Sequence, residues 1–420
     1  MSANRSDKHA HPRRALVTGG ATGIGWAISR ALAAQGLTIA LADINIAAAR
    51  DRVAELGQGH VALDVDLSDL SAAATLPERA AQALGGLDVI VNNAGITDTS
   101  GRRIGEIPDT DFDRLVAVNL GSVEAICRAG QVVLGQGGVT VNLASGAAYR
   151  ALPLRGAYSA TKAGVVALTE MMNSRARPLG QRVCAVAPGY VRTELVESLI
   201  ANGRLDPVVA ASTIPLGRLG TPEDIAQGVA FLASPLGAVM AGKCLAVDGG
   251  TGASGGATVQ PQDAGYTDAP EGGRLVVIGA SSDAARVADT LDDASHVETV
   301  ADLGTFRSAS AVIDLGGLTA MDTASALARA RAIAGQIEEL APPRGFTLLM
   351  SVRATDPVVT AAMDMMARLL AIEWGSRGYR VNTIGWSGDS LDGLAGLAAY
   401  LTSGAAGYVT GQLIRAGAEG

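Results

Sequence analysis

Two residues that could move a proton lie four positions apart, Tyr158 and Lys162 in the segment YSATK. That spacing places both side chains on one face of a helix. A free tyrosine has a pKa of about 10 and is a poor base near neutral pH, but a neighbouring ammonium lowers that pKa. Ser145 ends an earlier apolar run and could donate a hydrogen bond to a substrate oxygen. Singly, the tyrosine is a packing residue and the serine a helix cap, so the hypothesis of acid–base catalysis depends on their combination.

A glycine-rich segment, TGGATGIG at residues 18–25, follows a strand-like run and precedes a helical pattern. Glycines there permit a tight turn and let a pyrophosphate approach the N–H groups of a helix N-terminus. Asp43 ends the next apolar run, where a carboxylate can accept hydrogen bonds from ribose hydroxyls and would repel a 2′-phosphate. No basic residue adjoins Asp43 in the sequence. An ordinary strand–helix turn and a helix cap are the alternatives, but together the two features favour NAD over NADP.

Short apolar runs and amphipathic segments alternate along the first 250 residues and would position these groups. The alternation indicates a parallel sheet with helices on both faces, an α/β fold of the doubly wound, Rossmann-like type. The runs that predict strands are residues 14–19, 37–43, 60–66, 87–95, 137–145 and 181–189.

The same pattern begins again in the C-terminal part of the chain. The offsets between matching segments fall from 260 to 198 to 169, which indicates a tandem duplication whose second copy is shorter in two places. The matching pairs are RALVTGGA (14–21) with RLVVIGAS (274–281), PLGQRVCAVAP (178–188) with SRGYRVNTIGW (376–386), and VMAGKCLAVDG (239–249) with YVTGQLIRAG (408–417). Residues 251–273 are rich in Gly, Ala, Pro and Asp, which is typical of a linker. We therefore expect a disordered tail at 1–12, domains at 13–250 and 274–420, and a linker at 251–273.

Composition narrows the class of protein. The 420 residues suit two domains, and the net charge of −8 argues against a nucleic-acid or membrane partner. Cys127, Cys184 and Cys244 lie in apolar stretches and are expected to be buried, reduced thiols. Four histidines without ligand spacing predict no metal site. With no apolar leader or membrane-spanning run, we expect a cytoplasmic protein.

At this point the first 250 residues resemble the short-chain dehydrogenase/reductase family. The resemblance spans residues 14–250 and is specific, because many motifs occur in the right order and at the right spacing. They are TGGATGIG, Asp43, DLSD (66–69), NNAG (92–95), Asn119 in VAVNL, Ser145, Tyr158, Lys162 and APGYVRT (187–193). Cys184 stands where the family usually has Asn, a structural position.

The resemblance implies a role for each matching residue. Tyr158 would be the catalytic acid/base, Lys162 would lower its pKa and bind the nicotinamide ribose, and Ser145 would stabilise the reacting oxygen. Asn119 would hold a water that links Lys162 to solvent. Asp66 would reach the adenine, with Asp64 as a competitor for that role. The full set implied to bind NAD is Gly19, Gly23, Ile24, Gly25, Asp43, Asp66, Leu67, Asn92, Gly95, Tyr158, Lys162, Pro188, Gly189, Val191 and Thr193.

The second copy resembles the same fold without its functional groups. By the offsets, Thr18, Gly23 and Gly25 become Ile278, Asp283 and Ala285, and Tyr158 and Lys162 become Asp356 and Thr360. VIDLGG (312–317) replaces NNAG, and residues 190–220 have no counterpart. We therefore expect no dinucleotide and no catalysis in residues 274–420; a divergent enzyme with another base is the alternative.

Relatives in this family assemble as tetramers through the helices that carry the Tyr-Lys pair. The equivalent segment of the second copy, residues 356–374, is rich in Met, Ala and Leu and predicts an interface. We expect this copy to replace one subunit, so that each chain is a pseudo-dimer and a homodimer forms a pseudo-tetramer.

The substrate leaves few traces in the sequence. Arg155, Arg102 and Ala147 are candidates for substrate contact, and the arginines would suit an anionic group; solvated surface positions are the alternative interpretation for them. We expect an NAD-dependent oxidoreductase acting on a secondary alcohol or ketone, such as a polyol or a hydroxy acid. A reductase of 3-oxoacyl thioesters and a non-catalytic NAD(H)-binding scaffold are the alternatives.

Overall fold

The computed structural model describes residues 13–203, 205–259, 274–291, 297–300, 309–319 and 322–417. The predicted tail at 1–12 and most of the predicted linker lie outside these residues. The first residues of that linker are described and are not irregular, because Thr251–Ser254 form a short helix, α10.

The first domain is built on a parallel sheet. Within the described residues it has seven strands in the order β3-β2-β1-β4-β5-β6-β7, which confirms the predicted doubly wound α/β fold. Registers such as Val17 with Leu41 and Val91 align the carboxyl ends of β2, β1 and β4 at one edge. The strands are β1 Arg14–Thr18, β2 Thr38–Asp43, β3 Val61–Asp64, β4 Val89–Asn92, β5 Val139–Leu143, β6 Arg182–Pro188 and β7 Cys244–Val247.

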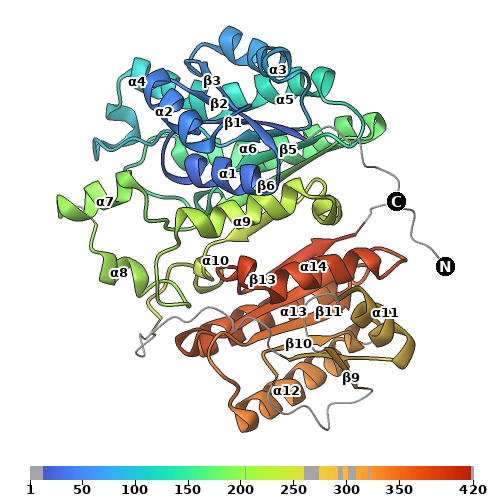
Figure 1. Cartoon of the computed structure of the whole chain (residues 1–420). Coiled ribbons are helices and arrows are strands. Elements are labelled where there is room, and N and C mark those ends of the chain that lie inside the picture. The colour runs from blue at the N-terminus through green and yellow to red at the C-terminus, as the bar shows by residue number, and fades with distance from the viewer. Residues whose placement is uncertain are drawn as a thin grey trace.

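Helices cover both faces of this sheet (Figure 1). Helices α1, α2 and α9 pack on one face, and α3, α5 and α6 on the other, with apolar strand residues buried beneath each set. The helices are α1 Gly23–Ala34, α2 Ile46–Leu56, α3 Leu70–Leu84, α4 Asp109–Val116, α5 Ser122–Val133, α6 Tyr158–Ala176, α7 Glu194–Ala201, α8 Pro207–Ala211 and α9 Pro222–Ala233. Asn45, Asp69, Thr193 and Thr221 begin α2, α3, α7 and α9 with side-chain caps.

The second domain has a parallel sheet of the same design. Six strands among its described residues run in the order β13-β12-β11-β10-β8-β9, which repeats the first sheet without the counterpart of β3. The elements are β8 Leu275–Ile278, α11 Ser281–Leu291, β9 Val297–Val300, β10 Ala311–Asp314, α12 Thr323–Leu340, β11 Thr347–Arg353, α13 Pro357–Trp374, β12 Arg380–Trp386, α14 Asp392–Thr402 and β13 Gln412–Ala416.

The second copy is shorter in the two intervals that the offsets predicted. Only 10 residues separate Val300 from Ala311, whereas 45 separate Asp43 from Val89, so a helix–strand–helix unit is missing. Between β12 and β13 the segment that would match α7 and α8 is missing as well. The chain is also shorter between β10 and α13, so the prediction of two places was incomplete.

The two domains meet through α9 and α14, which face each other in Figure 1. The rings of Phe231 in α9 and Tyr400 in α14 stack with centroids 4.0 Å apart and planes 4° apart. These residues are 169 positions apart, the offset that relates the copies in this region. The contacts around them are reciprocal: the 3-10 turn Pro235–Met240 packs on α14, and the equivalent turn Gly404–Ala406 packs on α9. Reciprocal contacts between equivalent surfaces are the property of a two-fold interface.

The sequence predicted an interface on residues 356–374, which contain α13, whereas the stacked rings at the domain boundary belong to α9 and α14. Helix α13 buries Met363, Ala367 and Leu370 against its own sheet and meets the first domain at α10. Its outer residues Val358 and Met365 are exposed. Most of the apolar residues that suggested an interface therefore form the second domain's own core, and the exposed ones leave the predicted interface on this helix a prediction.

The cysteines and His60 lie within the described residues. The three cysteines are free thiols; Cys127 and Cys184 are buried as expected, while Cys244 is only half-buried. His60 lies beside β3 and accepts a hydrogen bond from the Ile39 N–H. Among the described helices, none is both long and apolar enough to cross a membrane.

Candidate active site

The glycine loop between β1 and α1 is held by the segment after β4. The Thr18 hydroxyl accepts hydrogen bonds from the N–H groups of Asn93 and Ala94 at 3.0 and 3.1 Å, and the Asn93 amide donates to the carbonyls of Thr18 and Gly19. Gly19 has a φ of +60°, which favours glycine. A Cβ on Gly25 would lie 2.0 Å from the Gly19 carbonyl oxygen. The loop therefore requires these glycines to bring its backbone close to α1, which is the cradle that a pyrophosphate needs.

Asp43 lies at the carboxyl end of β2, directly beside this loop. Its carboxylate accepts hydrogen bonds from the N–H groups of Ala21 at 3.1 Å and Asn45 at 3.0 Å. The absence of a basic neighbour holds in the sequence but not in space, because the Arg52 guanidinium donates to the Ala21 carbonyl at 3.2 Å. Arg52 forms an ion pair with Glu55 and does not line the cavity described below. Asp43 is therefore the charged group that faces the cavity at this position.

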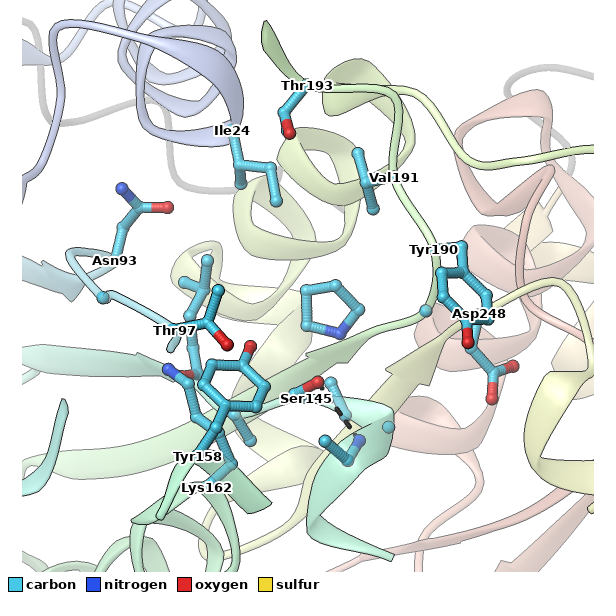
Figure 2. A pocket seen from close by; sticks show the side chains of 18 of the residues that line it. Ile24, Asn93, Thr97, Ser145, Tyr158, Lys162, Tyr190, Val191, Thr193 and Asp248 are labelled. Carbon is cyan, nitrogen blue, oxygen red and sulfur yellow. Dashed lines mark hydrogen bonds between the residues drawn. The ribbon is translucent and has the colours of Figure 1, made fainter. Parts of the chain in front are cut away.

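Tyr158, Lys162 and Ser145 come together where α6 begins beside the end of β5. The Tyr158 hydroxyl is hydrogen-bonded to Ser145, whose Oγ also accepts the Ala147 N–H at 3.1 Å. The Lys162 ammonium donates to the Leu143 carbonyl at 2.8 Å and lies 5.8 Å from the centre of the Tyr158 ring. Figure 2 shows the three side chains grouped on one side of the cavity. The predicted combination is thus present in space.

Burial dominates the electrostatics of this group. It raises the pKa of Tyr158, and the hydrogen bond with Ser145 opposes that shift. Burial also lowers the pKa of Lys162 to about 8. The expected lowering of the Tyr158 pKa by Lys162 is not found, because the ammonium is held by a backbone carbonyl and not by the phenol oxygen.

Asn119 is fully buried in a π-helical turn, Ala117–Gly121, between α4 and α5. Its side chain exchanges two hydrogen bonds of 2.8 Å with the backbone of Ile96 and donates a third to Thr161. A Cβ on Gly95 would lie 3.4 Å from both Asn119 Oδ1 and Lys162 Nζ. Asn119 therefore fixes the segment after β4 close to Lys162 without lining the cavity itself.

A cavity of about 1080 Å³ connects these features. It runs along the carboxyl edge of the sheet, from the glycine loop past Tyr158 to the boundary with the second domain. Of the residues that the resemblance assigned to the cofactor, it is lined by Gly19, Gly23, Ile24, Gly25, Asp43, Asp66, Leu67, Gly95, Tyr158, Lys162, Pro188, Gly189, Val191 and Thr193.

One cofactor assignment from the sequence changes, and another is decided between two candidates. Asn92 is 2% exposed and donates to Asn142 inside the core, and Asn93 lines the cavity in its place. Asp66 lines the cavity and Asp64 does not, which decides between these competitors. Two hydrogen bonds from Ser68, one from its backbone N–H and one from its hydroxyl, lower the pKa of Asp66.

The substrate candidates separate in the same way. Arg155 and Ala147 line the cavity, but Arg102 is exposed on the loop after β4 and lies outside it.

Several lining residues were not found from the sequence. Glu194 accepts a hydrogen bond from the Gly23 N–H at 3.4 Å, and its place directly after Thr193 was an available signal. Tyr149, Tyr190 and Asp248 also line the cavity. The second domain adds Arg368, for which no local sequence signal exists because only the docking of the domains brings it there.

The equivalent region of the second domain is closed. Two residues separate β8 from α11, whereas four separate β1 from α1, so the loop that would surround a pyrophosphate is absent. Asp356, at the position of Tyr158, caps α13 by accepting the N–H groups of Val358 and Val359. The strand register places Arg353 where the first domain has Ser145. Its guanidinium bridges the carbonyls of Leu318 and Gly388 at 3.1 and 3.0 Å.

Comparison with known proteins agrees with this geometry. The family model described as Enoyl-(Acyl carrier protein) reductase matches residues 19–252, more than half of the chain. The chain belongs to the short-chain dehydrogenase/reductase family. The match ends before β8, the first strand of the second sheet. The second domain carries no family assignment.

Relatives of this short-chain dehydrogenase/reductase cover the same part. An uncharacterized short-chain type dehydrogenase/reductase from Sinorhizobium fredii is 37% identical over 249 residues, 58% of this chain and 44% of that protein. A sorbitol dehydrogenase from Cereibacter sphaeroides is 35% identical over 57% of this chain and 96% of its own length. Cis-4-hydroxycyclohexanecarboxylate dehydrogenase from Sinomonas cyclohexanicum is 38% identical over 57% and 96%. The chain thus spans less than half the length of the first of these.

Solved structures give the same boundary. A 3-ketoacyl-(acyl-carrier-protein) reductase from Brucella melitensis complexed with NADH is 30% identical, with a TM-score of 0.53 over 57% of this chain and 98% of that one. A short chain dehydrogenase from Burkholderia cenocepacia in complex with NADP is 32% identical, with a TM-score of 0.52 over 57% and 97%. Both nicotinamide cofactors therefore occur among similar structures.

Proposed function

We propose that the first domain transfers a hydride between NAD(H) and a secondary alcohol or ketone, with Tyr158 as the acid/base. The observation that carries this proposal is the single cavity that joins the glycine loop to Tyr158, Lys162 and Ser145. The similarity to alcohol and polyol dehydrogenases supports a substrate of the CH–OH class. A polyol or a hydroxy acid fits this class.

The residues of the site suit this reaction. When bound, NAD supplies the acceptor of the hydride. The Tyr158 oxygen takes the proton of the substrate hydroxyl in oxidation and returns it in reduction. Ser145, already hydrogen-bonded to Tyr158, can donate to the same substrate oxygen. Lys162, with a pKa of about 8, is mostly an ammonium at pH 7 and places a positive charge near the nascent phenolate.

NAD is the cofactor that Asp43 favours. A carboxylate accepts hydrogen bonds from both ribose hydroxyls and repels a 2′-phosphate. We expect wild type to use NAD+ well and NADP+ poorly, and Asp43→Ala to narrow that preference about tenfold or more, since a hydrogen bond to a charged group contributes ~1.5–3 kcal/mol. The ratio of kcat/KM for the two cofactors measures this. Comparable turnover of both by wild type would contradict NAD specificity.

Reduction of a 3-oxoacyl thioester is the second candidate. It is supported by the similarity to the Brucella reductase and by the description of the matching family model. An NAD(H)-binding scaffold without catalysis is less well supported, because it gives no role to the grouped Tyr158, Lys162 and Ser145.

A panel of alcohols with NAD+, followed by absorbance at 340 nm, tests the proposal. The panel should contain polyols, hydroxy acids and simple secondary alcohols, with a 3-oxoacyl thioester and NADH in the reverse direction. Turnover in the alcohol set supports the proposal. Turnover of the thioester alone would favour the second candidate, and none in either direction would favour the scaffold.

We further propose that each chain is a pseudo-dimer, in which the second domain takes the place of a partner subunit. The reciprocal contacts of α9 and α14 support this. The equivalent helices α6 and α13 both present apolar residues to solvent, Met171 on the first and Val358, Met365 and Leu369 on the second. A second chain that covers these faces would give a homodimer with the form of a pseudo-tetramer. Sedimentation of the full chain as a monomer would contradict this assembly.

A further inference from the structure

The cavity continues beyond Tyr158 to a wall made by the second domain. Thr410–Leu413, where β13 begins, and Arg368 on α13 line it. This wall is fixed to the first domain, because the Gln412 amide donates to the Ala246 carbonyl at 2.9 Å and accepts the Ala246 N–H at 3.2 Å. In Figure 2 Asp248 and Tyr190 lie across from Tyr158 and Ser145, on the side where the second domain's faint red ribbon passes.

Arg368 is the cationic group of this wall. Its Nη2 pairs with Asp364 at 3.0 Å, and Asp364 in turn accepts the N–H of Leu413 at 3.0 Å. The guanidinium is thereby held in place from α13 and β13 together. Its Nε is buried and, within the described part of the chain, has no hydrogen-bond partner. A guanidinium held in this way can donate hydrogen bonds to a ligand oxygen.

The charges at this end of the cavity favour an anion. Arg150, Arg155 and Arg368 line the cavity, and neither Arg150 nor Arg155 forms an ion pair with the described residues. The one carboxylate that lines the same end, Asp248, accepts the N–H groups of Gly250 at 2.9 Å and Gly252 at 2.8 Å. Burial raises the pKa of Asp248, and its backbone hydrogen bonds and the charge of Arg368 oppose that shift. Arg150, Arg155 and Arg368 thus bring three guanidiniums to the cavity wall, and the oxygens of Asp248 already accept backbone N–H groups.

We propose that Arg368 of the second domain binds a carboxylate of the substrate, so that the substrate compartment is completed across the domain boundary. This inference rests on the proposed function and narrows its substrate class to hydroxy acids or oxo acids. A guanidinium suits a carboxylate because its planar donors match the two oxygens. The second domain is then a determinant of specificity for a reaction that takes place in the first domain.

Two probes of the same shape and different charge test this, cyclohexanecarboxylate and cyclohexanecarboxamide. Each is titrated calorimetrically into the full chain with and without NADH. Wild type should bind the carboxylate about ten- to a hundredfold more tightly than the amide, the range expected for a hydrogen bond to a charged group. Equal affinity for the two probes, or binding of neither, would overturn the proposal.

Variants then assign the preference to Arg368. Arg368→Gln should remove it, and Arg368→Lys, which keeps the charge and loses the planar donors, should retain part of it. The matched control is Arg377→Gln, which removes a guanidinium of the same domain that pairs with Glu338 outside the cavity. It should bind both probes as wild type does. A preference that survives Arg368→Gln, or disappears in Arg155→Gln alone, would show that Arg368 is not the binding group.

The outcome is separable from the proposed function. Dehydrogenase turnover without any carboxylate preference would defeat this inference alone. Carboxylate preference in a chain that oxidises no alcohol would defeat the proposed function alone. Thermal midpoints of all variants, compared with wild type, show whether each is folded.

Discussion

Tyr158 is positioned by two elements that the sequence separates, the end of β5 with Ser145 and the first turn of α6. Its burial raises the pKa above the ordinary value of about 10, so the fold alone does not make it a base. The positive charge of Lys162 must therefore act once substrate and cofactor complete the site. This makes the hydroxyl itself the residue-scale feature to test.

Tyr158→Phe should reduce turnover by about 10²–10⁴-fold, the usual contribution of a positioned proton donor or acceptor. NADH affinity should change little, since the ring and its packing stay. Steady-state kinetics and fluorescence titration measure the two effects. Activity above about a hundredth of wild type would show that another group moves the proton.

Lys162 should leave a signature in the pH dependence of stability. Its pKa is about 8 in the fold and near 10.5 when the chain is unfolded. Between these values the unfolded state holds more protons, so the unfolding free energy should rise with pH, by up to about 3 kcal/mol. Lys162→Met should lack this rise when urea unfolding is compared at pH 8 and pH 10. Parallel profiles for the two proteins would contradict the assigned pKa.

Residue types were predictable where a motif carries them, but side-chain direction was not. Consecutive residues at the end of a strand point to opposite faces. Asn92 therefore turns into the core toward Asn142, and Asn93 turns toward the glycine loop. The sequence NNAG offers both equally. Arg102 lies in the predicted loop after β4, but its side chain is exposed and does not line the cavity.

At the scale of elements, the strands and helices followed from the apolar pattern, whereas the interface did not. Helix α13 has the composition of an interface helix, but it uses Met363, Ala367 and Leu370 for its own core and leaves Met365 and Leu369 exposed. The helices that dock, α9 and α14, are apolar nearly all round, since one side meets the sheet and another the partner domain. An apolar pattern of that kind predicts that a helix is buried, but it does not predict which element packs against it.

Tyr400 tests the docking of α9 and α14. Tyr400→Ala should lower the unfolding free energy by about 3–5 kcal/mol, as expected for loss of a buried aromatic ring stacked on Phe231. Tyr400→Phe is the matched control. The Tyr400 hydroxyl is buried without a hydrogen-bond partner among the described residues, so this change should be neutral or stabilising. Denaturant unfolding measures both, and equal stability of the two variants would mean that the stacked rings do not support the interface.

At the scale of the whole molecule, the tandem organisation was predicted from three pairs of similar segments in the sequence. The number of missing elements was not, because offsets record only the total change in length between matches. The loss of the helix–strand–helix unit after β9 and the filling of the second site by Arg353 required the fold. Both support the expectation that the second domain is a structural partner that binds no dinucleotide.

Removal of the second domain should therefore harm the first. A fragment of residues 1–255 would expose the side of α9 that carries Phe231, and such an apolar patch favours aggregation. We expect a lower thermal midpoint and self-association, measured by calorimetry and light scattering. A soluble, fully active fragment with unchanged thermal stability would show that the second domain is a passenger.

One chain should contain one nicotinamide site, in its first domain. Calorimetric titration of the full chain with NADH tests it most directly. The four-residue glycine loop and Asp43 predict binding to the first domain, and the two-residue loop before α11 predicts none to the second. We expect one NADH per chain, with weaker binding after Asp43→Ala. Two equivalents per chain, or a single equivalent unaffected by Asp43→Ala, would contradict it.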